Sequence, residues 1–188
     1  MHMDEILELN ELIRGHCRRN KIRLIDAYPD FDDGSGRLKN EYSHGDGGHL
    51  NGAGYKKLGE LIAIRTVEQL QPGKVIACLG DSITEGYPGH LNERKIGNQW
   101  QPYTHYLQKP KMKVLNFGVS GDTTDGMTVR FFRDVLKSRA TACIILGGVN
   151  DILGGIPASE AFQNLSALYS ECDRQAIIPI AVTVLPID

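Results

Sequence analysis

The sequence has little that would place it outside the ordinary globular proteins. Its 188 residues carry a formal net charge of only −2. No run of Lys or Arg forms a basic stripe, which argues against nucleic acid or an acidic membrane as a partner. No apolar segment approaches the length of a bilayer span, so we expect no membrane insertion. Internal repeats and low-complexity tracts are also absent from the sequence.

Cysteine is sparse and follows no motif. The four cysteines, at positions 17, 78, 143 and 172, show no C-x-x-C spacing, so we expect neither a disulfide framework nor a zinc site. Cys78 and Cys143 lie within apolar runs, which predicts buried free thiols. The first residues begin an amphipathic, acidic segment without the hydrophobic region of a signal peptide. Together these features predict a protein of the reducing cytoplasm.

Short apolar runs alternate with helical patterns along the chain. The predicted strands are residues 21–27, 75–80, 113–118, 141–146 and 177–185, and the predicted helices are residues 4–19, 51–70, 99–107, 125–135 and 159–175. We expect the last strand to start after Pro179, because proline is poorly tolerated inside a strand. The alternation predicts one α/β domain, in which helices cover both faces of a mostly parallel sheet of roughly five strands.

Small and polar residues gather in four loop or strand-end segments. These segments are residues 46–49, 80–82, 120–122 and 148–151. All strands of a parallel sheet end at one edge, and ligands bind outside that edge. We therefore expect the four segments to converge there although they are far apart in the sequence.

The residue types in these segments match the needs of acyl transfer. Ser82 supplies a hydroxyl nucleophile, which needs a base to take its proton. His49 is the candidate base, and Asp46, three residues earlier in the chain, can accept the other ring N–H and fix the tautomer. An oxyanion could be bound by the backbone N–H groups of Ser82 and Gly121 and by the side-chain amide of Asn150.

Each of these residues has a simpler interpretation when it is taken alone. A Gly-Asp-Ser sequence, Gly121 and Asn150 all occur in ordinary turns or helix caps. His44, Asp46 and His49 can be solvated loop residues, or they can bind a divalent metal. Three ligands on no rigid element fit a metal site poorly. The joint occurrence of four such segments favours the catalytic interpretation.

The four segments resemble the sequence blocks of the SGNH hydrolases, also called GDSL esterases/lipases. The matching blocks are residues 80–84, 116–123, 148–151, and 46–49 followed by 50–55. The resemblance extends over nearly the whole chain and implies a flavodoxin-like three-layer α/β/α fold. It also implies the catalytic roles given above for Ser82, His49 and Asp46, and the oxyanion roles of Ser82, Gly121 and Asn150. No metal and no organic cofactor are implied.

The order of the blocks departs from that of the family. The Asp-x-x-His block precedes the serine block here, whereas it comes last in the family. We expect a circular permutation, in which residues 1–70 are equivalent to the family's C-terminal part and residues 74–188 to its N-terminal part. The family's old ends would be joined near residues 66–73. An oligomer that exchanges the N-terminal segment at the new termini is a further expectation, since short hinges permit such exchange.

The sequence thus predicts a serine esterase that hydrolyses small carboxylic esters through an acyl-enzyme on Ser82. We expect the loop at residues 85–100, with Tyr87, Pro88, His90 and Trp100, to wall the acyl pocket. This loop has few contiguous apolar residues, which favours small soluble esters or acetylated sugars over long lipid chains. Thioesterase, lysophospholipase and carbohydrate acetylesterase activities of the same family stay open.

Two hypotheses without catalysis also stay open. One is a flavodoxin-like module that binds an anionic ligand at residues 80–84. The sequence lacks G-x-x-x-x-G-K-[ST] and lacks G-x-G-x-x-G in the right context, which weakens that hypothesis. The other is a permuted scaffold that folds but has lost activity because its termini are loose.

Overall fold

Five strands form one sheet at the centre of the molecule. The structure is a computed structural model that describes residues 2–66, 73–88, 101–108 and 112–187. The strands are β1 (Arg23–Ile25), β2 (Val75–Gly80), β3 (Lys113–Gly118), β4 (Ala142–Leu146) and β5 (Ile178–Val182). Every pair of neighbouring strands is parallel, and their order is β1-β5-β4-β2-β3. The predicted α/β fold with a five-stranded parallel sheet is confirmed.

The strand order is that of the flavodoxin-like folds. Numbered from β2 onward, with β1 counted last, the sheet reads 2-1-3-4-5, which is the flavodoxin-like order. β2 lies between β3 on one side and β4 on the other. The chain therefore changes its winding direction at β2, and the carboxyl end of this strand lies at the topological switch point where such sheets bind ligands.

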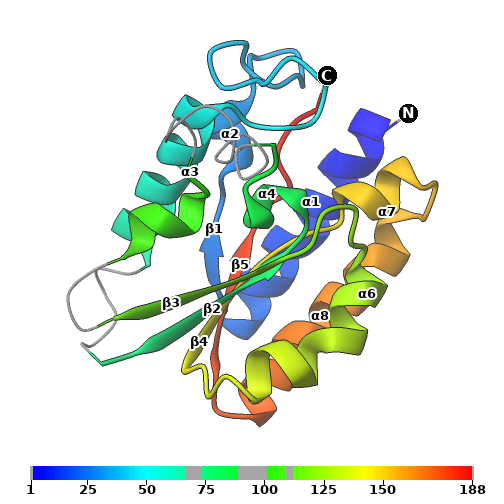
Figure 1. Cartoon of the computed structure of the whole chain (residues 1–188). Coiled ribbons are helices and arrows are strands. Elements are labelled where there is room, and N and C mark those ends of the chain that lie inside the picture. The colour runs from blue at the N-terminus through cyan, green and yellow to red at the C-terminus, as the bar shows by residue number, and fades with distance from the viewer. Residues whose placement is uncertain (1, 67–72, 89–100, 109–111, 188) are drawn as a thin grey trace.

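Helices cover both faces of this sheet (Figure 1). On one face lie α1 (His2–Asn20), α6 (Thr124–Phe131), α7 (Val149–Leu153) and α8 (Ala158–Arg174). On the other lie α2 (Tyr28–Phe31), α3 (Gly52–Arg65) and the 3-10 helix η2 (Tyr103–Leu107). Successive residues of β2 contribute to the two cores in turn, as the alternation of side chains along a strand requires. The predicted three layers are confirmed.

The helix α3 starts where its cap was predicted. The side-chain oxygen of Asn51 accepts the N–H of Gly54 at 3.0 Å, and its amide donates to the carbonyls of Glu41 and Ser43 at 3.0 Å each. Asn51 thus begins the helix and ties it to the preceding loop. The predicted continuation of this helix to Leu70 runs beyond residue 66 and lies outside the described residues.

The prediction that the last strand starts after Pro179 is wrong, since β5 includes this proline. The N–H of Ile178 donates to Thr141 on the β4 side at 3.0 Å. Successive peptide groups of a strand alternate in direction, so the nitrogen of Pro179 faces the β1 side. Pairing with β1 begins only at Ile180. The missing N–H therefore removes no ladder bond, which is the condition under which a strand accepts proline.

Three short helices within the described residues were not predicted. They are α2, α4 (Ser82–Glu85) and α7, each four or five residues long, which is too short to show a 3.6-residue periodicity. The helix predicted at residues 125–135 continues from α6 into a π-helical turn, η3 (Phe132–Leu136). The helix predicted at residues 99–107 is the 3-10 helix η2, and residues 99 and 100 lie outside the described residues.

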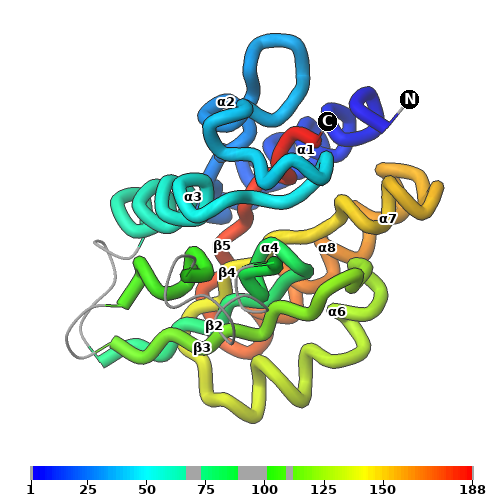
Figure 2. Tube along the Cα trace, turned by 45° about the horizontal axis from the view of Figure 1, so that its top comes forward, coloured from blue at the N-terminus to red at the C-terminus, as the bar shows by residue number. Residues whose placement is uncertain are grey.

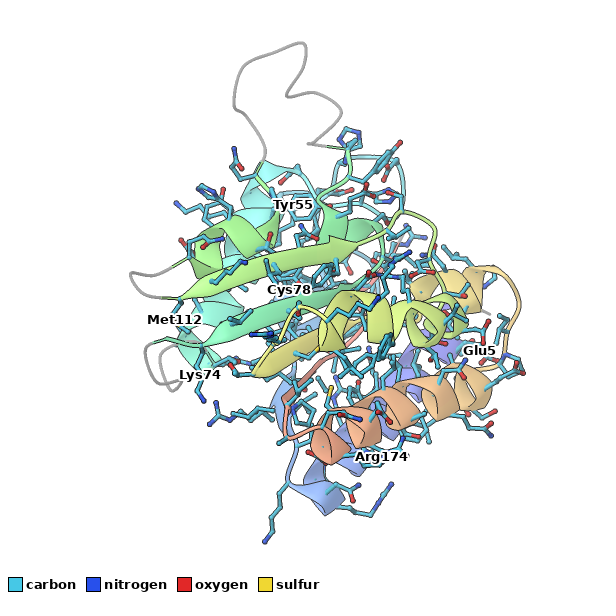
Figure 3. All side chains as sticks on the ribbon, turned by 60° about the horizontal axis from the view of Figure 1, so that its bottom comes forward. Glu5, Tyr55, Lys74, Cys78, Met112 and Arg174 are labelled. Atoms are coloured by element: carbon cyan, nitrogen blue, oxygen red, sulfur yellow. The ribbon has the colours of Figure 1, made fainter. Side chains whose placement is uncertain are left out.

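All four cysteines are free and buried, as predicted for Cys78 and Cys143. Figure 3 places Cys78 on β2, in the middle of the sheet. Among the helices that the structure describes, none combines the length and the apolar composition needed to cross a bilayer.

The two described ends of the chain lie at the same end of the molecule as the loop between α2 and α3 (Figures 1 and 2). The buried side chain of Asn10 on α1 accepts the N–H of Val184 at 2.8 Å and donates to its carbonyl at 2.9 Å. The side chain thus pairs with the backbone that leaves β5 much as a neighbouring strand would. This contact fixes the N-terminal helix to the chain beyond the last strand.

Candidate active site

Ser82 is the first residue of α4, directly beyond the carboxyl end of β2. Asp81 is the N-cap of this helix, and its side chain accepts the N–H of Ile83 at 2.9 Å. Only 6% of the Ser82 surface is exposed. The N–H groups in the first turn of a helix have no intrahelical partner, so the amide of Ser82 is available to a ligand. The strand-to-helix turn thus presents both the hydroxyl and the amide of this serine at the sheet edge.

A chain of hydrogen bonds joins Ser82 to the loop between α2 and α3. The Nε2 atom of His49 lies 2.9 Å from Ser82 Oγ, and Nδ1 lies 2.8 Å from Asp46 Oδ2. The carboxylate of Asp46 only accepts hydrogen bonds, so Nδ1 carries the ring proton. The Nε2 atom is then the acceptor for the Ser82 hydroxyl. The structure thus brings all three predicted residues together, and in a neutral imidazole these contacts select the tautomer that a general base needs.

The carboxylate of Asp46 is held in its ionised form. Burial raises its pKa, but hydrogen bonds from the backbone N–H groups of Gly48 and His49 and from the His49 ring outweigh that effect, and the pKa lies below its usual value. The two backbone bonds, at 3.2 and 2.9 Å, both end on Oδ1. The other oxygen is therefore left for the imidazole, and the loop geometry fixes where the ring lies.

An aromatic contact also holds the imidazole. The rings of His49 and Tyr87 have centroids 4.6 Å apart. The carbonyl of Tyr87 accepts the hydroxyl of the buried Tyr55 at 2.5 Å, which links this contact to α3. Sequence reasoning placed Tyr87 only in the wall of a pocket and did not predict its contact with the ring. Pairing of an aromatic ring with the candidate base has no signature in sequence spacing.

The structure also brings Gly121 and Asn150 to the edge where Ser82 lies. Gly121 has φ +77°, and a Cβ built there would meet nothing within 4 Å. This glycine is therefore required by its left-handed conformation, which residues with a Cβ rarely adopt. The side-chain amide of Asn150 donates to the carbonyl of Asp122 at 2.9 Å. One N–H of that amide is thus used, and among the described residues the second has no hydrogen-bond acceptor, so it could bind an oxyanion.

These residues line one cleft of about 490 Å³. Its described lining consists of residues 46–49, Ser82, Tyr87, Ser120, Gly121, Asn150, Leu153 and Ile187. The volume is in the range of small-molecule sites. Three of the larger lining side chains, those of Tyr87, Leu153 and Ile187, offer apolar or aromatic surface. The predicted wall residues His90 and Trp100 lie outside the described residues. No group of three or more His, Cys, Asp or Glu within the described ranges could hold a metal ion.

Two features near the cleft were missed by sequence reasoning. Glu85, at the end of α4, accepts hydrogen bonds from both the N–H and the hydroxyl of Ser120. Gly118 permits this approach, because a Cβ there would lie 2.0 Å from the nitrogen of Glu85. Arg130 on α6 reaches two strand ends behind the cleft. Neither contact is marked by a sequence motif, since both depend on backbone groups that come together only in the folded protein.

With this geometry in view, the comparison with known proteins identifies the class. The GDSL-like lipase/acylhydrolase family matches residues 78–188 of this chain. The match covers more than half of the chain, and the chain belongs to this family of hydrolases. The predicted family is thus confirmed.

Individual relatives are more distant. A lipoprotein of Bacillus subtilis (strain 168), YqeF, described as uncharacterized, is 29% identical over 118 residues, which are 60% of this chain and 49% of that protein. The chain thus spans about half the length of this curated relative. The solved structure of a G-D-S-L family lipolytic protein from Desulfitobacterium hafniense DCB-2 is 24% identical, with a TM-score of 0.45 over 57% of this chain and 58% of that one. For an acetyl xylan esterase, AlAXEase, the identity is 19% and the TM-score 0.44, over 57% of this chain and 56% of that one.

Asp81 gives a prediction for the pH dependence of stability. Burial raises the pKa of this carboxyl from 3.8 to about 7, the N–H of Ile83 opposes the rise, and the charges of Asp122 and Asp151 add to it. Between pH 3.8 and about 7, the folded protein keeps a proton on Asp81 that the unfolded chain has lost. The Asp81 side chain therefore lowers the free energy of unfolding as pH rises through this window.

Asp81→Asn keeps an oxygen that can cap α4 and removes this titration. The difference in free energy of unfolding, variant minus wild type, should therefore increase as pH rises from about 4 to about 7. Urea unfolding at several pH values measures this difference. A difference that stays constant with pH would show that the folded protein does not hold a proton on Asp81.

Proposed function

We propose that this protein is a serine esterase that hydrolyses small carboxylic esters through an acyl-enzyme on Ser82. The observation that carries the proposal is the hydrogen-bonded series from Asp46 through His49 to Ser82 Oγ, with distances of 2.8 and 2.9 Å. Membership of the GDSL-like lipase/acylhydrolase family supports the reaction class. The cleft in front of Ser82 supplies room for a small ester.

In the acylation step, Ser82 Oγ attacks the ester carbonyl while its proton moves to Nε2 of His49. The carbonyl oxygen becomes an oxyanion and accepts hydrogen bonds from the amides of Ser82 and Gly121 and from the free N–H of Asn150. The ionised Asp46 stabilises the imidazolium that forms. Collapse of the intermediate breaks the bond to the alcohol oxygen, which leaves with the proton from His49.

In the deacylation step, a water molecule attacks the acyl carbon. His49 takes one proton from this water, and the same donors bind the second oxyanion. Collapse then releases the carboxylic acid, and the proton on His49 returns to Ser82 Oγ. Ester and water enter, acid and alcohol leave, and the balance needs no cofactor.

Replacement of the nucleophile tests the mechanism. Ser82→Ala should lower kcat for p-nitrophenyl acetate by at least about 1,000-fold, because the attacking oxygen is lost while the oxyanion donors remain. Ser166→Ala is the matched control, since Ser166 is half-buried on α8, lies outside the described lining of the cleft, and donates its hydroxyl to the carbonyl of Gln163. Circular dichroism verifies the fold of both variants. Undiminished turnover in the folded Ser82 variant would exclude this nucleophile.

A fluorophosphonate probe separates the esterase from the two hypotheses without catalysis. Only an activated serine reacts, so the probe should label wild type at Ser82 and leave Ser82→Ala unlabelled. A ligand-binding module, or a scaffold that has lost its activity, would fold normally and remain unlabelled. Labelling of wild type together with turnover would exclude both.

The cleft favours small acyl groups. Of its described lining, only Tyr87, Leu153 and Ile187 offer extended apolar or aromatic surface, beside the polar groups of Asp46 and Ser120. We therefore expect kcat/KM to be highest for acetyl or butyryl esters and to fall by about tenfold or more for decanoyl esters, since a long chain would lie largely in water. A series of p-nitrophenyl esters measures this dependence. A steady rise with chain length would instead favour the lysophospholipase alternative, and a preference for acyl thioesters would favour a thioesterase.

Circular permutation remains a proposal, which the strand order supports. Residues 1–70 would be equivalent to the family's C-terminal part and residues 74–188 to its N-terminal part, because the sheet reads 2-1-3-4-5 only when β1 is counted last. A rearranged chain, with residues 74–188 first and joined by a flexible linker to residues 1–66, should fold and keep kcat within about threefold. A rearranged chain that cannot fold would contradict the permutation.

The expectations on location and partners stay predictions. A cytoplasmic location is supported by the four free, buried thiols, whereas YqeF is named a lipoprotein. Fractionation of producing cells tests this location.

Exchange of the N-terminal segment between protomers predicts a dimer in size-exclusion chromatography with light scattering, and a monomer at all concentrations would contradict it.

A further inference from the structure

A buried arginine lies behind the candidate oxyanion site. Arg130, on α6, is 8% exposed. Its guanidinium donates to the carbonyl of Gly80 at 2.9 Å and to the carbonyl of Phe117 at 2.8 Å. It also donates to the carboxylates of Asp122 and Asp134, at 2.7 and 2.9 Å. One side chain thus joins the carboxyl ends of β2 and β3 to the turn that follows β3.

Two of these partners, Gly80 and Asp122, lie within two residues of a residue of the candidate site. Gly80 is two residues before Ser82, and its carbonyl also accepts the N–H of Val119 at 3.0 Å. Asp122 directly follows Gly121. Through its own carbonyl, Asp122 accepts the side-chain amide of Asn150. The arginine is therefore connected to the segments that carry all three oxyanion donors.

Resting on the esterase function proposed above, we infer that Arg130 is a positioning residue that keeps the oxyanion donors in register with Ser82. It does not line the cleft among the described residues, so it acts through Gly80 and Asp122 and not on the substrate. Donors must stay within a few tenths of an ångström of their places to stabilise a transition state. Loss of the guanidinium would leave the turn at Gly121 and the Asn150 amide held by fewer bonds.

The fork of an arginine suits this task better than a lysine does. Its planar guanidinium offers five N–H donors in fixed directions, whereas a lysine offers one rotatable ammonium. The four acceptors lie on different segments, and two of them are carbonyls at strand ends. The charge of Arg130 also offsets those of the half-buried Asp122 and the buried Asp134, with which it forms ion pairs.

Steady-state kinetics of Arg130→Lys test the inference. Because the variant keeps the charge and loses the fork, we expect kcat for p-nitrophenyl acetate to fall by about 100-fold, comparable to the loss of one oxyanion donor, with KM changed by less than about threefold. A phenylboronic acid, which forms a tetrahedral anion on the serine, should bind weaker by a similar factor. All rates are divided by the concentration of sites that the fluorophosphonate probe labels.

Arg14→Lys is the matched control. Arg14 on α1 donates two bonds to Asp26, at 3.0 and 2.8 Å, and neither residue contacts the oxyanion segments. Thermal unfolding should show a loss of stability in this variant, and steady-state kinetics should show no change in kcat.

If Arg130→Lys fails to fold, Asp122→Asn gives the second test, since it weakens the bond to Arg130 Nε and keeps the carbonyl that holds Asn150. We then expect a smaller fall in kcat, again at nearly constant KM.

The outcomes separate the two proposals. The positioning role is wrong if kcat of the folded Arg130→Lys variant equals that of wild type or falls no more than in Arg14→Lys. The same criterion applies to Asp122→Asn if that variant takes its place. In either case the arginine only stabilises the fold. If wild type itself neither turns over esters nor reacts with the probe, the esterase function fails first. A selective loss of kcat and of boronate affinity supports the positioning role.

Discussion

The parallel direction of all five strands is the constraint on which the rest of the molecule depends. It sends every strand's carboxyl end to one edge, so the turns after β2, β3 and β4 meet although they lie far apart in the sequence. β2 lies at the switch point, with β3 on one side and β4 on the other. Ser82 is therefore flanked by the turn that carries Gly121 and by the helix that carries Asn150, and backbone geometry supplies most of the candidate site.

The candidate base comes to this edge from the other end of the chain. The loop that bears Asp46 and His49 follows β1, the edge strand beside β5, and the cap at Asn51 fixes where that loop ends. A catalytic series depends on where its members lie in space and not on their order in the chain. The unusual block order is therefore compatible with the same geometry, provided that the contact of Asn10 with Val184 holds α1 on the sheet.

The sequence was informative wherever a residue's role follows from its chemistry and from the end of a strand. Ser82 could be predicted on both grounds. His49 and Asp46 lie in the loop between α2 and α3 and could be predicted from their chemistry and spacing, and the structure brings the three residues together. Features set by backbone direction could not be predicted. Pro179 is accepted inside β5 because its nitrogen faces the β1 side, where pairing begins only at Ile180. The contacts of Arg130 were also hidden, since two of its four partners are carbonyls that any residue could supply.

The central claim is that Ser82 carries the acyl group during turnover. Rapid mixing of the wild-type protein with p-nitrophenyl acetate, quenching in acid within milliseconds, and mass spectrometry of the peptides test this claim directly. The account predicts a mass increase of one acetyl group on the peptide that contains Ser82, which disappears as the substrate is exhausted. Turnover without an acyl group on this peptide, or with the group on another residue, would contradict the account.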